Sequence, residues 1–163
     1  MAKRATPAAS RCGVILAVNI SERKGQKKHD VGRCRLLRDF GIDGDAHAGT
    51  PTRQVSLLSQ ASVDKMTALG LKVGYGDFAE NFTIARLTVH ELPVGTLLKI
   101  GAKAVLRITR IGKECHARCE IYRLVGDCIM PREGVFADVL TEGEVRVGDE
   151  VTVVDAASDA ERA

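Results

Sequence analysis

Short apolar runs separated by glycine-containing or charged turns recur along the chain. Residues 13–19 form the first run, and their β-branched and aliphatic side chains predict a buried strand. The same pattern predicts extended segments at residues 33–39, 53–58, 78–84, 96–100 and 104–111. The apolar run 134–140 follows, and residues 144–154 predict a turn and a final strand.

Helical signals are few. Ser59 or Ser62 can cap a short helix that runs to Leu69 and ends at Gly70. Many short strands, few helices and frequent glycine turns favour a mainly β fold, a single closed or nearly closed barrel with a few short helices. We expect this domain to span residues 13–154, between a disordered tip at 1–12 and a flexible tail at 155–163.

Composition narrows the class of protein. The chain has 163 residues, which suits one domain, and no Trp, so the core must consist of Val, Ile, Leu and Ala. A formal net charge of +3, without a basic run interleaved with aromatic residues, argues against nucleic acid but suits an anionic small molecule. No apolar run approaches a membrane span, and the N-terminus does not resemble a signal peptide. We therefore expect a cytoplasmic location, where the five cysteines are reduced thiols.

Three of those cysteines cluster within fourteen residues. Cys115 follows a predicted strand, and the cationic Lys113 and Arg118 beside it favour its thiolate form, a nucleophile and soft metal ligand. His116, Cys119 and Cys128 complete a possible zinc site with Cys115, although structural zinc sites usually pair two short-spaced motifs. Burial of Cys119 and Cys128 as small apolar residues is an equal alternative.

Polar residues mark a second candidate site. Asp43, Asp45 and His47 alternate along a glycine-rich loop, where they could bind a ligand or simply form turns. Arg53 opens the next predicted strand, and Glu80-Asn81 interrupts an apolar one, so this pair either faces solvent or contacts a ligand. The basic segment 21–30 is interpreted as a solvated loop in preference to an anion site.

Taken in order, these segments resemble the MOSC domain family, named for the C-terminal domain of molybdenum cofactor sulfurase. The resemblance runs from about Gly13 to Val154, and it is closest to small stand-alone members. The matching segments are residues 41–49, 53–58, 78–83, 94–96, 112–115 and 146–149.

The resemblance implies a β-barrel in which Cys115 corresponds to the family cysteine. In sulfurase-type members that thiolate carries sulfur, and in reductase-type members it ligates molybdenum. Asp45, His47, Arg53, Glu80 and Asn81 would then lie near the cleft and hold a phosphorylated pterin or a metal-oxo group. Cys119 and Cys128 lie outside the general family pattern; they could resolve a persulfide or help to bind molybdenum, tungsten or zinc.

Sulfurase-type members carry a separate pyridoxal-phosphate desulfurase domain, which we do not expect in this sequence, so we give pyridoxal phosphate binding only as a property of the family. We expect a domain that binds molybdopterin or molybdenum, or carries sulfur on Cys115, with a cysteine desulfurase or a molybdopterin biosynthesis or insertion protein as partner. A non-catalytic module for molybdate, tungstate or the cofactor remains an alternative, as does a structural zinc domain.

Overall fold

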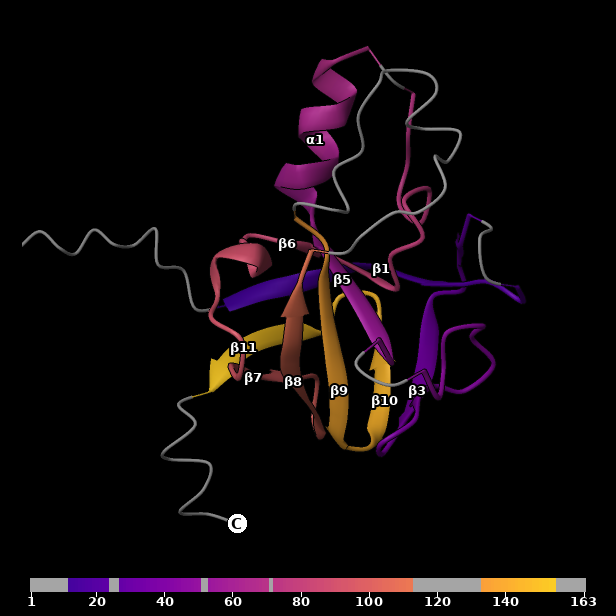
Figure 1. Cartoon of the computed structure of the whole chain (residues 1–163), viewed down its shortest axis with the longest axis vertical. Helices are drawn as coiled ribbons and strands as arrows, with labels where there is room; N and C mark the ends of the chain where they lie inside the picture. The colour runs from indigo at the N-terminus through magenta and orange to yellow at the C-terminus, as the bar shows by residue number, and fades with distance from the viewer. Residues whose placement is uncertain (1–11, 24–26, 51–52, 71, 113–132, 155–163) are drawn as a thin grey trace, which may run out of the picture.

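The computed structural model of the chain describes residues 12–23, 27–50, 53–70, 72–112 and 133–154. The expected N-terminal tip up to residue 11 and the expected tail 155–163 lie outside these ranges, and β1 begins at Cys12. Figure 1 shows the arrangement of the elements in space. The strands are β1 (Cys12–Ile20), β2 (His29–Asp30), β3 (Arg33–Leu37), β4 (Gly41–Ile42), β5 (Val55–Ser59), β6 (Phe82–Ala85), β7 (Leu97–Ile100), β8 (Ala104–Ile111), β9 (Val135–Thr141), β10 (Gly143–Arg146) and β11 (Glu150–Val154).

Seven of these strands close into a barrel. Their order is β11-β7-β8-β9-β5-β6-β1, and β11 pairs again with β1, with Val14 opposite Glu150. Every neighbouring pair is antiparallel except β5 and β6, which run parallel because the helix α1 (Gln60–Ala68) lies between them in the sequence. The predicted mainly β architecture with a single barrel is confirmed.

The remaining strands extend this barrel. β2 pairs with the C-terminal end of β1, and β10, β3 and β4 form a separate antiparallel sheet. Leu36, Ile42 and Val145 from this small sheet belong to the same apolar cluster as the barrel interior. The small sheet is therefore part of the same domain (Figure 1).

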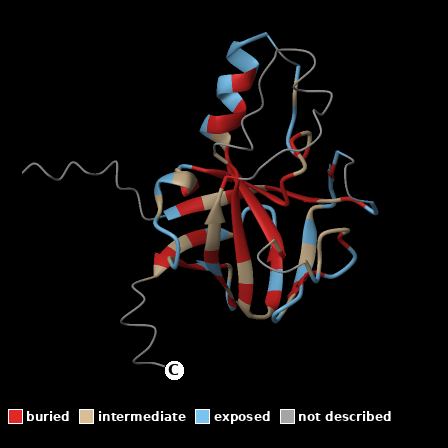
Figure 2. Cartoon of the chain, in the orientation of Figure 1, coloured by how far each residue is buried: buried red, intermediate tan, exposed pale blue. Residues whose placement is uncertain are grey.

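The barrel interior is filled by aliphatic side chains, as the scarcity of aromatic residues predicts. Among the described residues Phe82 is the one aromatic side chain in this cluster, and it is fully buried. Buried segments run along the strands of the barrel in Figure 2. Large buried contributors from five of the strands are Ile15, Leu57, Ile84, Leu98, Leu106 and Ile108.

A second apolar cluster covers β5 from outside. Val63 and Met66 of α1 pack with Leu58, Phe78 and Phe136, so all five residues of β5 are buried. Ser59 is the residue before the predicted helix, but its hydroxyl does not cap it. That hydroxyl instead donates to Leu87 O at 2.8 Å and accepts from Val89 N at 2.9 Å, which ties β5 to the 3₁₀ turn Val89–Glu91.

The extended segment predicted at 78–84 is wrong at its start. β6 begins at Phe82, and Gly76 and Ala79 before it both have positive φ angles, +90° and +66°. The Glu80 carboxylate accepts hydrogen bonds from Gly76 N and Phe78 N, which folds this stretch into a turn. The strand predicted at 33–39 likewise ends at Leu37, before the positive φ of Asp39.

Candidate functional site

A buried ion pair joins two loops beside the barrel. Lys28 Nζ lies 2.7 Å from Asp45 Oδ1, and neither side chain is exposed to solvent. The same ammonium donates to Ser21 Oγ at 3.1 Å and lies 3.1 Å from His47 Nδ1. An ammonium has three protons, and here it has three acceptors. Its charge is therefore fully partnered inside the protein.

Backbone contacts fix the Asp45 carboxylate in this position. Asp45 Oδ1 accepts from Ser21 N and Asp45 Oδ2 accepts from His47 N, both at 3.1 Å. Burial by itself would raise the pKa of this carboxyl group, but the Lys28 hydrogen bond and charge, with the two N–H donors, hold the pKa below its ordinary value. Asp45 is therefore ionised at neutral pH and holds two segments together.

The ion pair also determines which nitrogen of His47 carries a proton. An ammonium can only donate, so His47 Nδ1 must accept from Lys28 Nζ. A neutral imidazole that accepts at Nδ1 carries its proton on Nε2. His47 is partly exposed. It therefore has a donor N–H at Nε2 while its other ring nitrogen is fixed by a buried charge.

Arg53 is linked to His47 through the backbone. Thr50 N donates to His47 O, and Arg53 N donates to Thr50 O, both at 3.1 Å. The partly exposed Arg53 side chain carries its guanidinium over the Phe136 ring, 5.7 Å from the centroid, a cation–π contact. The predicted groups Asp45, His47 and Arg53 thus lie on one connected stretch of chain that leads into β5.

Glu80 and Asn81 lie inside the protein, and both residues are 0% exposed. Asn81 Oδ1 accepts from Ser56 N at 2.9 Å, and Asn81 Nδ2 donates to Asn19 O at 3.0 Å. These bonds join β6 to β5 and β1. Of the two alternatives left open by the sequence, exposure to solvent is therefore excluded for this pair, and the Asn81 side chain forms a polar connection between strands.

Glu80 is a buried carboxyl group whose partners are neutral. Besides Gly76 N and Phe78 N, it accepts from the Thr83 hydroxyl at 2.8 Å. Burial raises the pKa of Glu80, and these hydrogen bonds only partly oppose the effect. The carboxyl group therefore organises the turn before β6.

That turn supports Lys28. Lys28 N donates to Gly76 O at 2.8 Å, while Gly76 N donates to Glu80 Oε2 at 2.9 Å. A Cβ on Gly76 would lie 2.2 Å from Lys28 O, so only glycine allows the two backbones to approach this closely. Glu80 thus determines the position of Lys28 through Gly76, and Lys28 in turn fixes Asp45 and His47.

Comparison with a family profile shows which family the chain belongs to. A sequence profile of the MOSC domain matches residues 44–152. The chain belongs to the MOSC domain family. This family is generally linked to molybdenum cofactor-related function. A search of curated proteins gave no significant match.

Solved structures share the MOSC fold at low sequence identity. YuaD from Bacillus subtilis superposes with a TM-score of 0.73 at 17% identity, over 87% of this chain and 95% of that one. YiiM from Geobacillus stearothermophilus gives a TM-score of 0.68 at 18% identity, over 88% of this chain and 75% of that one. YiiM from Escherichia coli gives 0.61 at 14% identity, over 88% and 68%. These likenesses concern the fold.

The cysteine segment of this MOSC domain lies outside the described residues. Lys113, Cys115, His116, Arg118, Cys119 and Cys128 all belong to residues 113–132, so their predicted roles stay predictions. The two flanks of this segment are paired, since Gly112 N donates to Gly134 O at 2.6 Å. The Glu133 carboxylate accepts from Ser62 Oγ and Lys65 Nζ, each at 2.6 Å, which anchors Glu133 against α1.

The described part of the site fits an oxyanion better than a bare metal ion. Within the described ranges no group of three or more His, Cys, Asp or Glu side chains could hold a metal. Arg53 and the Nε2–H of His47 are donors suited to phosphate or metal-oxo oxygens.

No described helix is long and apolar enough to cross a membrane.

Sequence reasoning missed Lys28 and Ser21. The prediction of a solvated loop at 21–30 is wrong at these two buried residues. Lys28 stands among exposed polar neighbours at Lys27 and His29, so composition gives no sign that its side chain turns inward. The only local sign that Ser21 is buried is its position directly after the apolar strand β1.

Proposed function

We propose that this MOSC domain binds the anionic part of the molybdenum cofactor, or the molybdate or tungstate oxyanion, with Arg53 and His47. The observation that carries the proposal is the buried Lys28–Asp45 pair at 2.7 Å together with the Lys28–His47 contact. Because Lys28 and Asp45 neutralise each other, the net positive charge offered to a ligand comes from Arg53. His47 adds a neutral N–H donor of fixed orientation.

Glu80 and Asn81 contribute to this site as positioning residues. Both side chains are buried and occupied by internal hydrogen bonds, and Glu80 acts on Lys28 through Gly76. The expected direct contact of these two residues with a ligand is therefore replaced, in our proposal, by an indirect role. Their loss would weaken binding by moving Lys28, Asp45 and His47.

The chemistry that we propose for this domain is that of the Cys115 thiolate, with Lys113 and Arg118 favouring its ionised form. In one version the thiolate receives a sulfur atom from a cysteine desulfurase and delivers it to the cofactor. In the other it ligates the metal, and His116, Cys119 and Cys128 could assist. A molybdopterin biosynthesis or insertion protein is the proposed partner on the cofactor side.

A binding module without chemistry is the second candidate. It is supported by the chemistry of the two described donors, Arg53 and His47, which would contact an oxyanion without any thiol. In that case Cys115 would be dispensable for binding.

The test combines binding and mass measurements on the full chain. Molybdate and tungstate affinities are measured by calorimetry for the wild type, Arg53→Gln, His47→Gln and Cys115→Ser, with Lys99→Gln on β7 as the control for loss of one exposed cation. We expect Arg53→Gln to weaken binding about tenfold, because one charge-assisted contact is lost. Equal affinity in Arg53→Gln and Lys99→Gln would contradict the site.

A second measurement separates the candidates. The wild type and Cys115→Ser are incubated with a cysteine desulfurase and cysteine, and intact mass is recorded. Gain of one sulfur atom that depends on Cys115 supports the sulfur-carrier version. Unchanged mass with oxyanion affinity retained in Cys115→Ser supports the binding module. Stoichiometric zinc in freshly purified protein, with unfolding on chelation, would support a structural zinc domain instead.

A further inference from the structure

A separate pocket lies on the outer face of the barrel where β11, β1 and β6 meet. Its volume is about 390 Å³, within the range of small-molecule sites, and it is lined by Cys12, Gly13, Val14, Arg86, Gly148 and Glu150. None of these residues belongs to the site around Lys28 and Asp45. The residues proposed above to bind the molybdenum cofactor or an oxyanion do not line this pocket.

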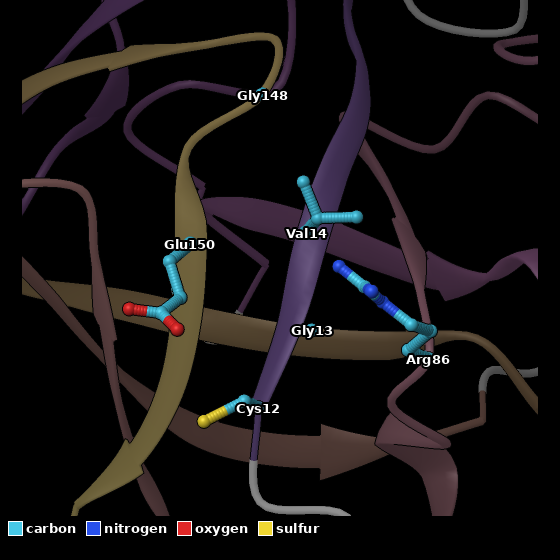
Figure 3. A pocket seen from close by; sticks show the side chains of 6 residues that line it. All are labelled: Cys12, Gly13, Val14, Arg86, Gly148 and Glu150. Carbon is cyan, nitrogen blue, oxygen red and sulfur yellow. The ribbon is translucent and has the colours of Figure 1, made fainter.

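The strand register places opposite charges on its two sides. Glu150 lies opposite Val14 on β1, and Val14 lies opposite Ala85, the residue before Arg86. The backbones that carry the two charges are thus about two strand spacings, roughly 10 Å, apart. Figure 3 shows Arg86 reaching toward Val14 from one side, while the Glu150 carboxylate and the Cys12 sulfur lie on the other side of β1.

Neither charge is satisfied by the described protein. Arg86 and Glu150 are exposed, and within the described ranges their side chains form no ion pair or hydrogen bond. In the structure they form no ion pair with each other across β1. A ligand that carries both an anionic and a cationic group could contact both sides of the pocket at once.

Arg86 is directed outward by an unusual backbone conformation. Its φ angle is +64°, which a non-glycine residue adopts at a cost, while Ala85 and Leu87 on either side are buried. Gly13 allows this arrangement, since a Cβ there would lie 2.6 Å from Ala85 O and 2.8 Å from Leu87 Cβ. The position of Arg86 is thus determined by the close packing of β1 on β6.

Cys12 adds a thiol to this charged pocket. It is exposed, whereas Cys34 is half-buried, and burial raises the pKa of Cys34 to about 12. At neutral pH Cys34 is therefore a protonated and poorly nucleophilic thiol. Of the two described cysteines, Cys12 is the one that an incoming small molecule can reach.

We propose that this pocket binds low-molecular-weight disulfides derived from amino acids, with Arg86 on a carboxylate and Glu150 on an ammonium group, and that Cys12 exchanges with them. The Cys12 thiol loses its proton to solvent, and its sulfur attacks one sulfur of the disulfide. The S–S bond of the ligand breaks and a Cys12–S–S–R bond forms. The departing thiolate takes the electron pair and a proton from solvent, so no further oxidant is needed.

The test measures the rate of mixed-disulfide formation at Cys12 in the full chain by peptide mapping, which separates Cys12 from Cys34 and from the cysteines of residues 113–132. Oxidised glutathione is the charged probe and bis(2-hydroxyethyl) disulfide the uncharged one. The variants are Arg86→Asn, because asparagine tolerates a positive φ, and Glu150→Gln. Arg107→Gln on β8 controls for the loss of one exposed cation outside the pocket, and Arg86→Lys for retention of charge.

We expect Arg86→Asn to slow the reaction of Cys12 with oxidised glutathione about fivefold at low salt, and Arg86→Lys to restore most of the rate. The uncharged disulfide should react equally with wild type and Arg86→Asn. Glu150→Gln should slow only the charged probe. Equal loss in Arg107→Gln, loss of rate with both probes, or no loss in either pocket variant would overturn the proposal.

Discussion

Lys28 Nζ lies 3.1 Å from His47 Nδ1, so a buried ammonium determines the tautomer of a partly exposed histidine. We expect nitrogen-15 NMR of the neutral His47 imidazole to show Nδ1 unprotonated and Nε2 protonated, the resonances being assigned by comparison with His47→Gln. In the double variant Lys28→Met/Asp45→Asn the constraint is absent, and a mixture of tautomers should appear. A dominant Nδ1–H form in the wild type would contradict this assignment, whether or not the protein binds an oxyanion.

The Lys28–Asp45 pair should show strong energetic coupling. Lys28→Met leaves a carboxylate buried without its cation, and Asp45→Asn leaves the cation without its carboxylate. Each single change should lower the free energy of unfolding by about 3–5 kcal/mol. The double variant should lose much less than the sum, because neither charge is left alone. Urea unfolding of the four proteins measures the coupling; additive losses would show that the two side chains act independently.

The same pair predicts acid sensitivity. The pKa of Asp45 is lower in the folded protein than its ordinary value of 3.8, so the folded state stabilises the ionised form. This contribution is fully present above the ordinary pKa and is lost as the pH falls through the lowered value. Between pH 6 and pH 3 the wild type should therefore lose more stability than Lys28→Met/Asp45→Asn, measured by urea unfolding at each pH. Parallel curves would contradict the ionic role of Asp45.

Most of the barrel was predictable because its strands are apolar runs bounded by turn residues. The hairpin of β7 and β8 around residues 101–103 is confirmed, as is the helix that ends before Gly70. The two-residue strands β2 and β4 were not predicted, since two residues carry no periodicity.

The candidate site was predictable only in part. Asp45, His47 and Arg53 were recognised from their spacing and their family resemblance. The burial of Lys28 depends on contacts with residues 17 and 19 positions further along, which a local pattern does not show. The environment of Glu80 and Asn81 was ambiguous for the same reason. A polar pair in an apolar segment has the same sequence pattern whether its side chains contact solvent, a ligand or other strands.

Glu80 should make stability fall as the pH rises. Its pKa is raised above the ordinary value of 4.5, so the folded state favours the protonated form. This contribution is present below pH 4.5 and is lost as the pH rises through the raised value. Glu80→Gln loses one hydrogen bond to a backbone N–H, about 1–3 kcal/mol, independently of pH. The advantage of the wild type over Glu80→Gln should therefore be smaller at pH 8 than at pH 5.

Urea unfolding at those two pH values provides the measurement. The exposed Glu22→Gln serves as the matched control for loss of a carboxylate, and its difference from the wild type should stay constant. An advantage of the wild type over Glu80→Gln that grows with pH would contradict the raised pKa.

Gly76→Ala should be among the most damaging small changes in the described chain. The alanine Cβ would lie 2.2 Å from Lys28 O, a backbone atom that can move only by disturbing the Lys28–Asp45 pair, and the φ angle of +90° adds strain. Gly95→Ala is the matched control, since Gly95 has a φ of +98° but nothing within 4 Å of its added Cβ. We expect a loss of about 1–2 kcal/mol at Gly95, from φ alone, and a clearly larger loss at Gly76.

The same comparison tests whether Gly76 supports the site. Besides lower stability, the folded Gly76→Ala protein should bind molybdate more weakly and show an altered His47 tautomer, whereas Gly95→Ala should leave both unchanged. If Gly76→Ala were no more destabilising than Gly95→Ala and kept the His47 tautomer, the connection from Glu80 through Gly76 to Lys28 would not control the site. Glu80 and Asn81 would then serve the barrel alone, because no other described contact links Glu80 to the Lys28 backbone.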